Sequence, residues 1–179
     1  MIKRTIPLIA LVFITFSELS AQDVFPDSWA GQYKGRLEIF AVDSVRMVLD
    51  MALNIQPTGI DSVYEWEIIY DFEGSKDVRT YELLIKDEKK GWYQIDEKND
   101  IIIDAYYRNG VLTSCFEVQN TFIIASYTKM DSNHILFEII AGDSKAFNTT
   151  GGTRKDDEEI PEVKSYKING RQKAVMSRE

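Results

Sequence analysis

The sequence predicts an all-β protein, a single antiparallel up-and-down meander of about nine or ten strands closed into a barrel, with a β-sandwich as the alternative. Three observations predict this fold. Apolar and polar residues alternate with period two over long stretches, which is typical of antiparallel sheet with one solvated face. Turn-forming residues separate these stretches. Finally, the chain contains no long segment with the apolar stripe of an amphipathic helix.

The first strand is expected in WAGQYKGRLEIF, residues 29–40. Alternation places Trp29 and Tyr33 on one face together with Gly31 and Gly35, while the opposite face is mostly charged or polar. Glycines on the apolar face allow the sharp coiling that a closed barrel needs, which favours the barrel over the sandwich. A bulge, or crowding against the two aromatic residues, is the alternative explanation of these glycines.

The segments that follow alternate in the same way and are separated by short turns. The sequence Arg108-Asn109-Gly110 predicts a hairpin, because Asn-Gly tolerates the positive φ angles of tight hairpin turns. The expected strands cover residues 45–56, 64–72, 79–86, 91–96, 100–107, 111–118, 121–129 and 134–141.

The composition changes after these strands. Residues from about 142 to 161 are rich in Gly, Ser, Thr, Asn and charged residues, which predicts a flexible loop. Residues 163–178 then supply a last strand, or a hairpin around Asn169-Gly170, that pairs back onto the sheet.

The N-terminus has the pattern of a secretory signal peptide. Lys3 and Arg4 precede an apolar run at residues 6–14, which is too short to cross a hydrocarbon core of ~30 Å, and Ala21 is a plausible cleavage site. We therefore expect residues 1–21 to be removed and residues 22–179 to form one domain. No cysteine lies near the cleavage site, so a secreted or periplasmic protein without a lipid anchor or a membrane span is expected.

The charge of the chain restricts its partners. Asp and Glu number 29 against 21 Lys and Arg, and the net charge is −8. Such acidity disfavours nucleic acids and anionic lipid surfaces, because their phosphates would repel the protein.

The residue types that most often support catalysis or metal binding are scarce. Cys115 is the only cysteine and His134 the only histidine. Cys115 shares its face with Thr113 and Glu117, and His134 is out of phase with the apolar residues that follow it, so neither a nucleophilic pair nor an inward haem ligand is expected. Acidic turns lack calcium-loop spacing. The sequence thus predicts no enzyme activity, no metal and no cofactor.

The opening Trp29-Ala30-Gly31-Gln32-Tyr33-Lys34-Gly35, followed by a long meander, resembles the first strand of calycin-type barrels, which include lipocalins, fatty-acid-binding proteins and nitrobindin-like domains. Asp27 stands where lipocalins usually have a glycine, and their paired cysteines are missing. More generally, the chain resembles small secreted lipocalin-like proteins of Gram-negative bacteria, most of which have no assigned activity. The resemblance implies a ligand site inside the barrel.

Several side chains on the apolar faces are candidates for that site. Arg79 shares its face with Tyr81, and by resemblance to fatty-acid-binding proteins the two would hold a ligand carboxylate. From the residues alone, a salt bridge between Arg79 at the barrel mouth and Asp77, Asp96 or Glu97 is the alternative. The expected walls of the site are Trp29, Tyr33, Trp66 and Tyr70.

The sequence therefore predicts a protein that binds a small apolar or amphipathic molecule, with or without a carboxylate. The alternative function is a non-catalytic structural or interaction module, which has a filled core and works through its outer surface and loops.

Overall fold

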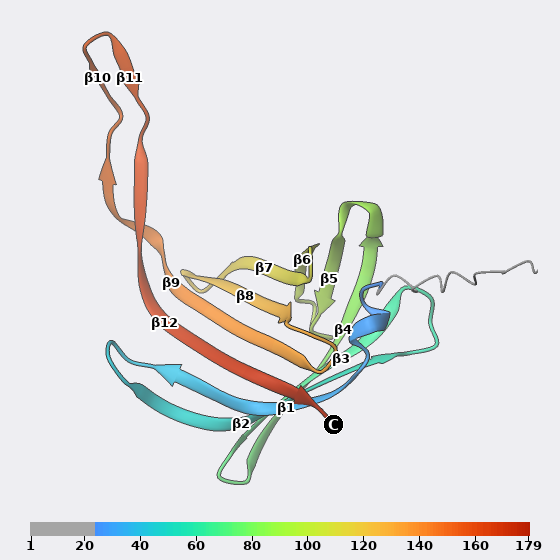
Figure 1. Ribbon diagram of the computed structural model, residues 1–179. Helices are drawn as coiled ribbons and strands as arrows, with labels where there is room; N and C mark the ends of the chain where they lie inside the picture. The colour runs from blue at the N-terminus through green and yellow to red at the C-terminus, as the bar shows by residue number, and fades with distance from the viewer. Residues whose placement is uncertain (1–23) are drawn as a thin grey trace, which may run out of the picture.

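The structure is a computed structural model, and it describes residues 24–179. Its main body is a closed antiparallel barrel in which strands adjacent in sequence pair with one another, and β12 closes the ring between β9 and β1 (Figure 1). The prediction of a closed barrel is confirmed, and the sandwich alternative is wrong. The predicted signal peptide, residues 1–21, lies outside the described residues.

The barrel strands are β1 (Gly31–Phe40), β2 (Val45–Pro57), β3 (Val63–Phe72), β4 (Ser75–Asp87), β5 (Trp92–Asp96), β6 (Ile102–Arg108), β7 (Val111–Val118), β8 (Thr121–Lys129), β9 (His134–Thr150) and β12 (Val163–Arg178).

Gly35 lies where the first and last strands meet. It is in register with Met176 of β12 and with Met51 of β2. A Cβ atom at this position would overlap the backbone carbonyl oxygen of Val175, so only glycine lets β12 approach β1 this closely. The close approach explains why a glycine on the apolar face accompanies closure of the barrel.

The strands predicted between residues 45 and 141 correspond to β2 through the first part of β9. The predicted hairpin at Asn109-Gly110 joins β6 to β7, and both residues have positive φ angles, 44° and 84°. Period-two alternation was sufficient to locate these strands because each has one face toward the barrel interior and one toward solvent.

The flexible loop predicted at about 142–161 is wrong in its secondary structure. β9 continues to Thr150, and β12 begins at Val163, directly opposite. A small hairpin of β10 (Thr153–Lys155) and β11 (Glu158–Ile160) forms the tip. We call residues 143–168 the arm, because Figure 1 shows this two-stranded ribbon projecting well beyond the barrel.

The strands of the arm could not be predicted from the sequence, for a physical reason. Both faces of a projecting ribbon are solvated, so its sequence has no alternation of apolar and polar residues to mark it as strand. The predicted hairpin alternative around Asn169-Gly170 is also wrong. β12 runs through this point as one strand, with register shifts against β9 on the N-terminal side of Gly170.

One end of the barrel is closed by Phe25 and by the short 3-10 helix η1 (Asp27–Trp29) that follows it. Phe25 stacks on Tyr107 with 4.5 Å between ring centroids and meets Tyr93 edge-on at 4.9 Å. The Tyr64 hydroxyl of β3 donates a hydrogen bond of 2.5 Å to Asp27 Oδ1, which ties η1 to the barrel wall.

We call the opposite end, where the β3–β4 and β5–β6 turns lie, the mouth. A second 3-10 helix, η2 (Glu88–Lys90), joins β4 to β5. Within residues 24–179, neither helix approaches the length and apolar character of a membrane span.

Candidate functional site

A cavity of about 150 Å³ lies inside the barrel, between its centre and the mouth. Its walls come from inward residues of β3 through β9. Ser114 and Ala125 pair in register on β7 and β8, and these two small side chains leave space opposite the larger aromatic ones. The lining residues with polar side-chain atoms are Trp66, Tyr70, Arg79, Tyr81, Glu97, Ser114 and Tyr127.

Arg79 lies at the mouth and is already paired. Its Nε and Nη2 atoms donate to Oδ2 of Asp77 at 3.1 and 3.0 Å, and 47% of its side chain is exposed. The guanidinium also lies over the ring of Tyr70, 5.1 Å from its centroid. The salt bridge with Asp77 is one of those expected from the sequence, and it occupies part of the donor fork that a ligand carboxylate would need.

The phenols around the mouth stay protonated at neutral pH. Burial raises the pKa of Tyr70 to about 12. Burial, and then the negative charge of Glu97, raises the pKa of Tyr81 as well. Both hydroxyls can therefore donate or accept hydrogen bonds from the cavity wall.

Trp66 lines the cavity from β3 and carries a buried polar group. Its side chain is fully buried, and its indole Nε1–H has no hydrogen-bond partner. Tyr127 packs edge-on against the Trp66 ring with 5.1 Å between centroids. Burial raises the pKa of the Tyr127 hydroxyl well above its ordinary value, and the nearby Trp66 indole N–H opposes this rise without making a hydrogen bond of good geometry. Buried N–H groups without partners are rare in folded proteins, so this donor calls for an explanation.

Of the six residues predicted to form the site, the structure brings four together around the cavity: Trp66, Tyr70, Arg79 and Tyr81. It separates the other two from them. Trp29 and Tyr33 are fully buried at the closed end, where the Tyr33 hydroxyl donates to the Trp29 carbonyl oxygen at 2.9 Å. They belong to the packing around η1 and do not line the cavity.

Sequence analysis missed Ser114 and Tyr127 as lining residues. Ser114 is 4% exposed and is the one polar residue in the buried core of the described chain. It shares its face with Phe116, so its inward direction was readable from the alternation. A small polar residue among bulky inward-facing ones indicates unfilled space in the interior of a barrel, and this signal was present in the sequence.

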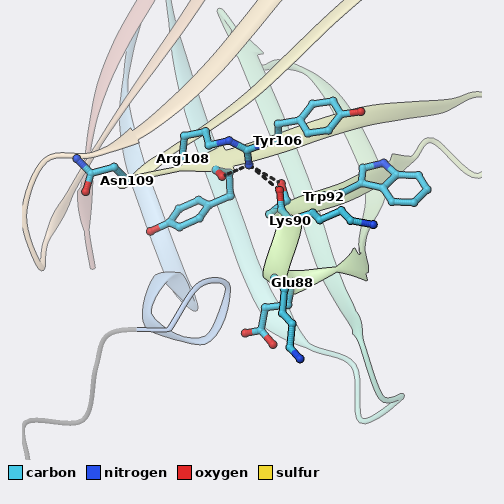
Figure 2. Close-up of a pocket in the computed structure, with 9 residues that line it drawn as sticks. Glu88, Lys90, Trp92, Tyr106, Arg108 and Asn109 are labelled. Atoms are coloured by element: carbon cyan, nitrogen blue, oxygen red, sulfur yellow. Dashed lines mark hydrogen bonds between the residues drawn. The ribbon is translucent and has the colours of Figure 1, made fainter.

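A second hollow lies on the outside of the barrel, where η2 meets the end of β6 (Figure 2). Figure 2 shows Arg108 reaching back to the backbone, where its Nη1 donates to the carbonyl oxygens of Lys90 and Tyr107 at 2.8 and 2.7 Å. The Trp92 indole donates to Asp104 at 2.8 Å. These donors already have partners within the protein, so the outer hollow is a weaker candidate than the interior cavity.

Cys115 and His134 do not form a site together. Cys115 is exposed on the outer face and is in register with Ile124, which pairs with Ile140 of β9. His134 begins that strand, roughly 20 Å away at the usual strand rise, and its Nδ1 lies 2.9 Å from Asp131. Among residues 24–179 there is no group of three or more metal-ligating side chains.

No family model and no curated protein matches the chain. Among solved structures, the chain is similar to a protein of unknown function from the DUF3598 family of Nostoc punctiforme, with a TM-score of 0.54 and 11% sequence identity. The match covers 86% of this chain and 48% of that one, so the chain spans about half the length of that protein. At this identity the likeness shows the fold, a closed β-barrel compatible with the calycin type.

Proposed function

We propose that the protein is a secreted or periplasmic, non-catalytic barrel that binds a small apolar or amphipathic molecule in its interior cavity. One observation carries this proposal: the space of about 150 Å³ between the closed end and the mouth, with polar groups in an otherwise apolar wall. Binding sites for small molecules combine apolar walls with a few placed polar groups. A cavity of this size accommodates a single ring, as a cavity of similar volume engineered into another protein holds benzene.

The four predicted residues around the cavity support the proposal in different ways. Trp66 and Tyr70 provide ring surfaces, while Tyr81 and Arg79 mark the rim where a ligand would enter. The aromatic packing of Phe25 at the closed end supports it too, because a barrel closed at one end admits a ligand only from the mouth.

The test is native mass spectrometry of the protein purified from its own host, beside an Ala125→Leu variant that fills the cavity. The wild type is expected to carry an additional small mass that the variant lacks. An Ala52→Leu variant, changed on the outer face of β2, should retain that mass. The bare polypeptide mass in all three samples would overturn the proposal.

A second candidate function, an interaction module, is favoured by the arm. Phe147, Tyr166 and Ile168 are largely exposed there, on a ribbon that has no core of its own. A second copy of the chain is the partner to test. If the arm mediates self-association, Phe147→Ser should shift the sedimentation of concentrated protein toward the monomer, whereas Val78→Ser, on the outer face of β4, should not.

A further inference from the structure

We infer that the cavity selects an uncharged ring compound that carries a hydrogen-bond acceptor, with the acceptor bound by the indole N–H of Trp66. This inference rests on the proposed function, because it names the class of ligand for the same cavity. Two independent observations support it, one at Trp66 and one at the mouth.

The first observation is the unpartnered donor. Trp66 is fully buried among the lining residues, and its Nε1–H makes no hydrogen bond of good geometry within the described chain, although the Tyr127 hydroxyl lies close enough for the indole to lower its pKa. The Trp92 indole on the outer face shows the usual arrangement, a bond of 2.8 Å to Asp104. A buried donor without a partner lowers stability unless water or a ligand accepts from it. Because Trp66 is one of the residues around the cavity, a ligand that enters the cavity and moves the side chains covering the indole would supply such an acceptor.

The register explains how the donor is held. Trp66 pairs directly with Ile55 of β2 on one side and with Tyr81 of β4 on the other. Its ring is further fixed by the edge-on contact with Tyr127. A side chain held between two central strands cannot turn its N–H toward solvent, so the acceptor must come into the barrel.

The charged residues at the mouth favour an uncharged ligand. The positive charge of Arg79 is balanced by Asp77 at 3.0 Å, and Glu97 adds a further negative charge to the lining. An anionic ligand would meet an occupied guanidinium and a carboxylate that repels it. Among the apolar lining residues, such as Ile68, Phe137 and Ile139, a charge on the ligand would be unpaired and costly to bury.

Three probes of nearly the same shape separate these requirements: acetophenone, which has a carbonyl acceptor; α-methylstyrene, which has a methylene group in its place; and benzoate, which is anionic. Because the two neutral probes differ in their own hydration, the informative quantity is how their ratio of dissociation constants changes between protein variants. Calorimetric titration of the full protein measures these constants.

In the wild type, α-methylstyrene leaves the Trp66 N–H without an acceptor, whereas the carbonyl oxygen of acetophenone supplies one. Trp66→Phe removes the donor and keeps an apolar ring. The ratio of the Kd of α-methylstyrene to that of acetophenone is expected to fall about ten- to hundredfold from the wild type to Trp66→Phe. The matched control is Trp29→Phe, the same change at the closed end, for which the ratio should stay unchanged.

A second measurement covers the case in which Trp66→Phe fails to fold. In 15N-labelled wild-type protein, with the indole resonances assigned through Trp29→Phe and Trp92→Phe, acetophenone should move the Trp66 Nε1–H resonance downfield and α-methylstyrene should not.

The outcomes separate the two proposals. Binding of both neutral probes with an unchanged ratio, or with no selective shift of the indole proton, would overturn the role of Trp66 while leaving a ligand-binding barrel. Benzoate binding as tightly as acetophenone would overturn the uncharged class. Failure of every probe to bind, joined with a bare polypeptide mass for protein from its own host, would overturn the proposed function itself.

Discussion

Arg79 and Asp77 form a forked contact at the mouth of the barrel, in which Nε and Nη2 of the guanidinium both donate to the same carboxylate oxygen at 3.1 and 3.0 Å. Both residues lie on the inward face of β4 near its first turn, so the pair sits where a ligand would enter.

This contact predicts how charge selectivity can be changed. Asp77→Asn removes the carboxylate that balances Arg79, so the affinity for benzoate is expected to rise, by about three- to tenfold for a half-exposed pair, while the affinity for acetophenone changes little. Calorimetric titration with both probes measures the change. The control is Asp50→Asn on the outer face of β2. An equal gain for both probes, or the same gain in the control, would contradict the assigned role of Asp77.

Alkaline unfolding follows from the buried tyrosines. Burial raises the pKa of Tyr70, of Tyr93 and of Tyr64 from 10.0 to about 12, the last with a further contribution from its bond to Asp27. Because the folded pKa lies above the unfolded one, the folded state holds these protons more tightly, and stability is expected to fall as the pH rises from 10 toward 12.

Absorbance of tyrosinate against pH, with urea unfolding at each pH, measures this effect. Part of the tyrosinate signal should appear only near pH 12 in the native protein and near pH 10 in urea. Complete ionisation of the native protein by pH 11 without unfolding would contradict the prediction.

Closure of the barrel is expected to depend on the absence of a side chain at Gly35. Gly35→Ala places a methyl group against the Val175 carbonyl, so β12 must move away from β1, and a loss of about 1–3 kcal/mol in unfolding free energy is expected. Gly170→Ala is the matched control, because there a Cβ would meet only the Cβ of Ala141, at 3.7 Å. Urea denaturation measures the free energy of unfolding of both variants. Equal values for Gly35→Ala and Gly170→Ala would contradict the role of Gly35 in closing the barrel.

The hydrogen bond between Tyr64 and Asp27 predicts the stability of the closed end. Tyr64→Phe removes the hydroxyl and leaves the ring, so a loss of about 1–2 kcal/mol is expected in urea denaturation at neutral pH. Combining it with Asp27→Asn in a double-mutant cycle tests the pairing, since the two effects should not add. Strict additivity would show that Asp27 does not depend on Tyr64.

Most of the fold was predictable because each barrel strand has one face in the interior of the barrel and one face in contact with solvent. Strands such as β2 and β3 show this difference as strict alternation, and Asn109-Gly110 marks a turn by its backbone requirements. The arm was not predictable by the same method, because a ribbon solvated on both sides leaves no alternation to detect.

The site was predictable only in part. Alternation indicates that Trp66, Tyr70 and Tyr81 point inward, but it does not tell at which level of the barrel a side chain lies. Trp29 and Tyr33 point inward as well, yet η1 packs over them at the closed end. Their level depends on the stagger of the strands and on the N-terminal segment, which are properties of the assembled barrel.

A crystal structure of the protein soaked with acetophenone tests the central claim most directly. We predict electron density for the ring beside Ser114 and Ala125, with the carbonyl oxygen about 2.9 Å from Trp66 Nε1. A cavity that holds only ordered water, with acetophenone absent or bound solely in the outer hollow near Trp92, would contradict it.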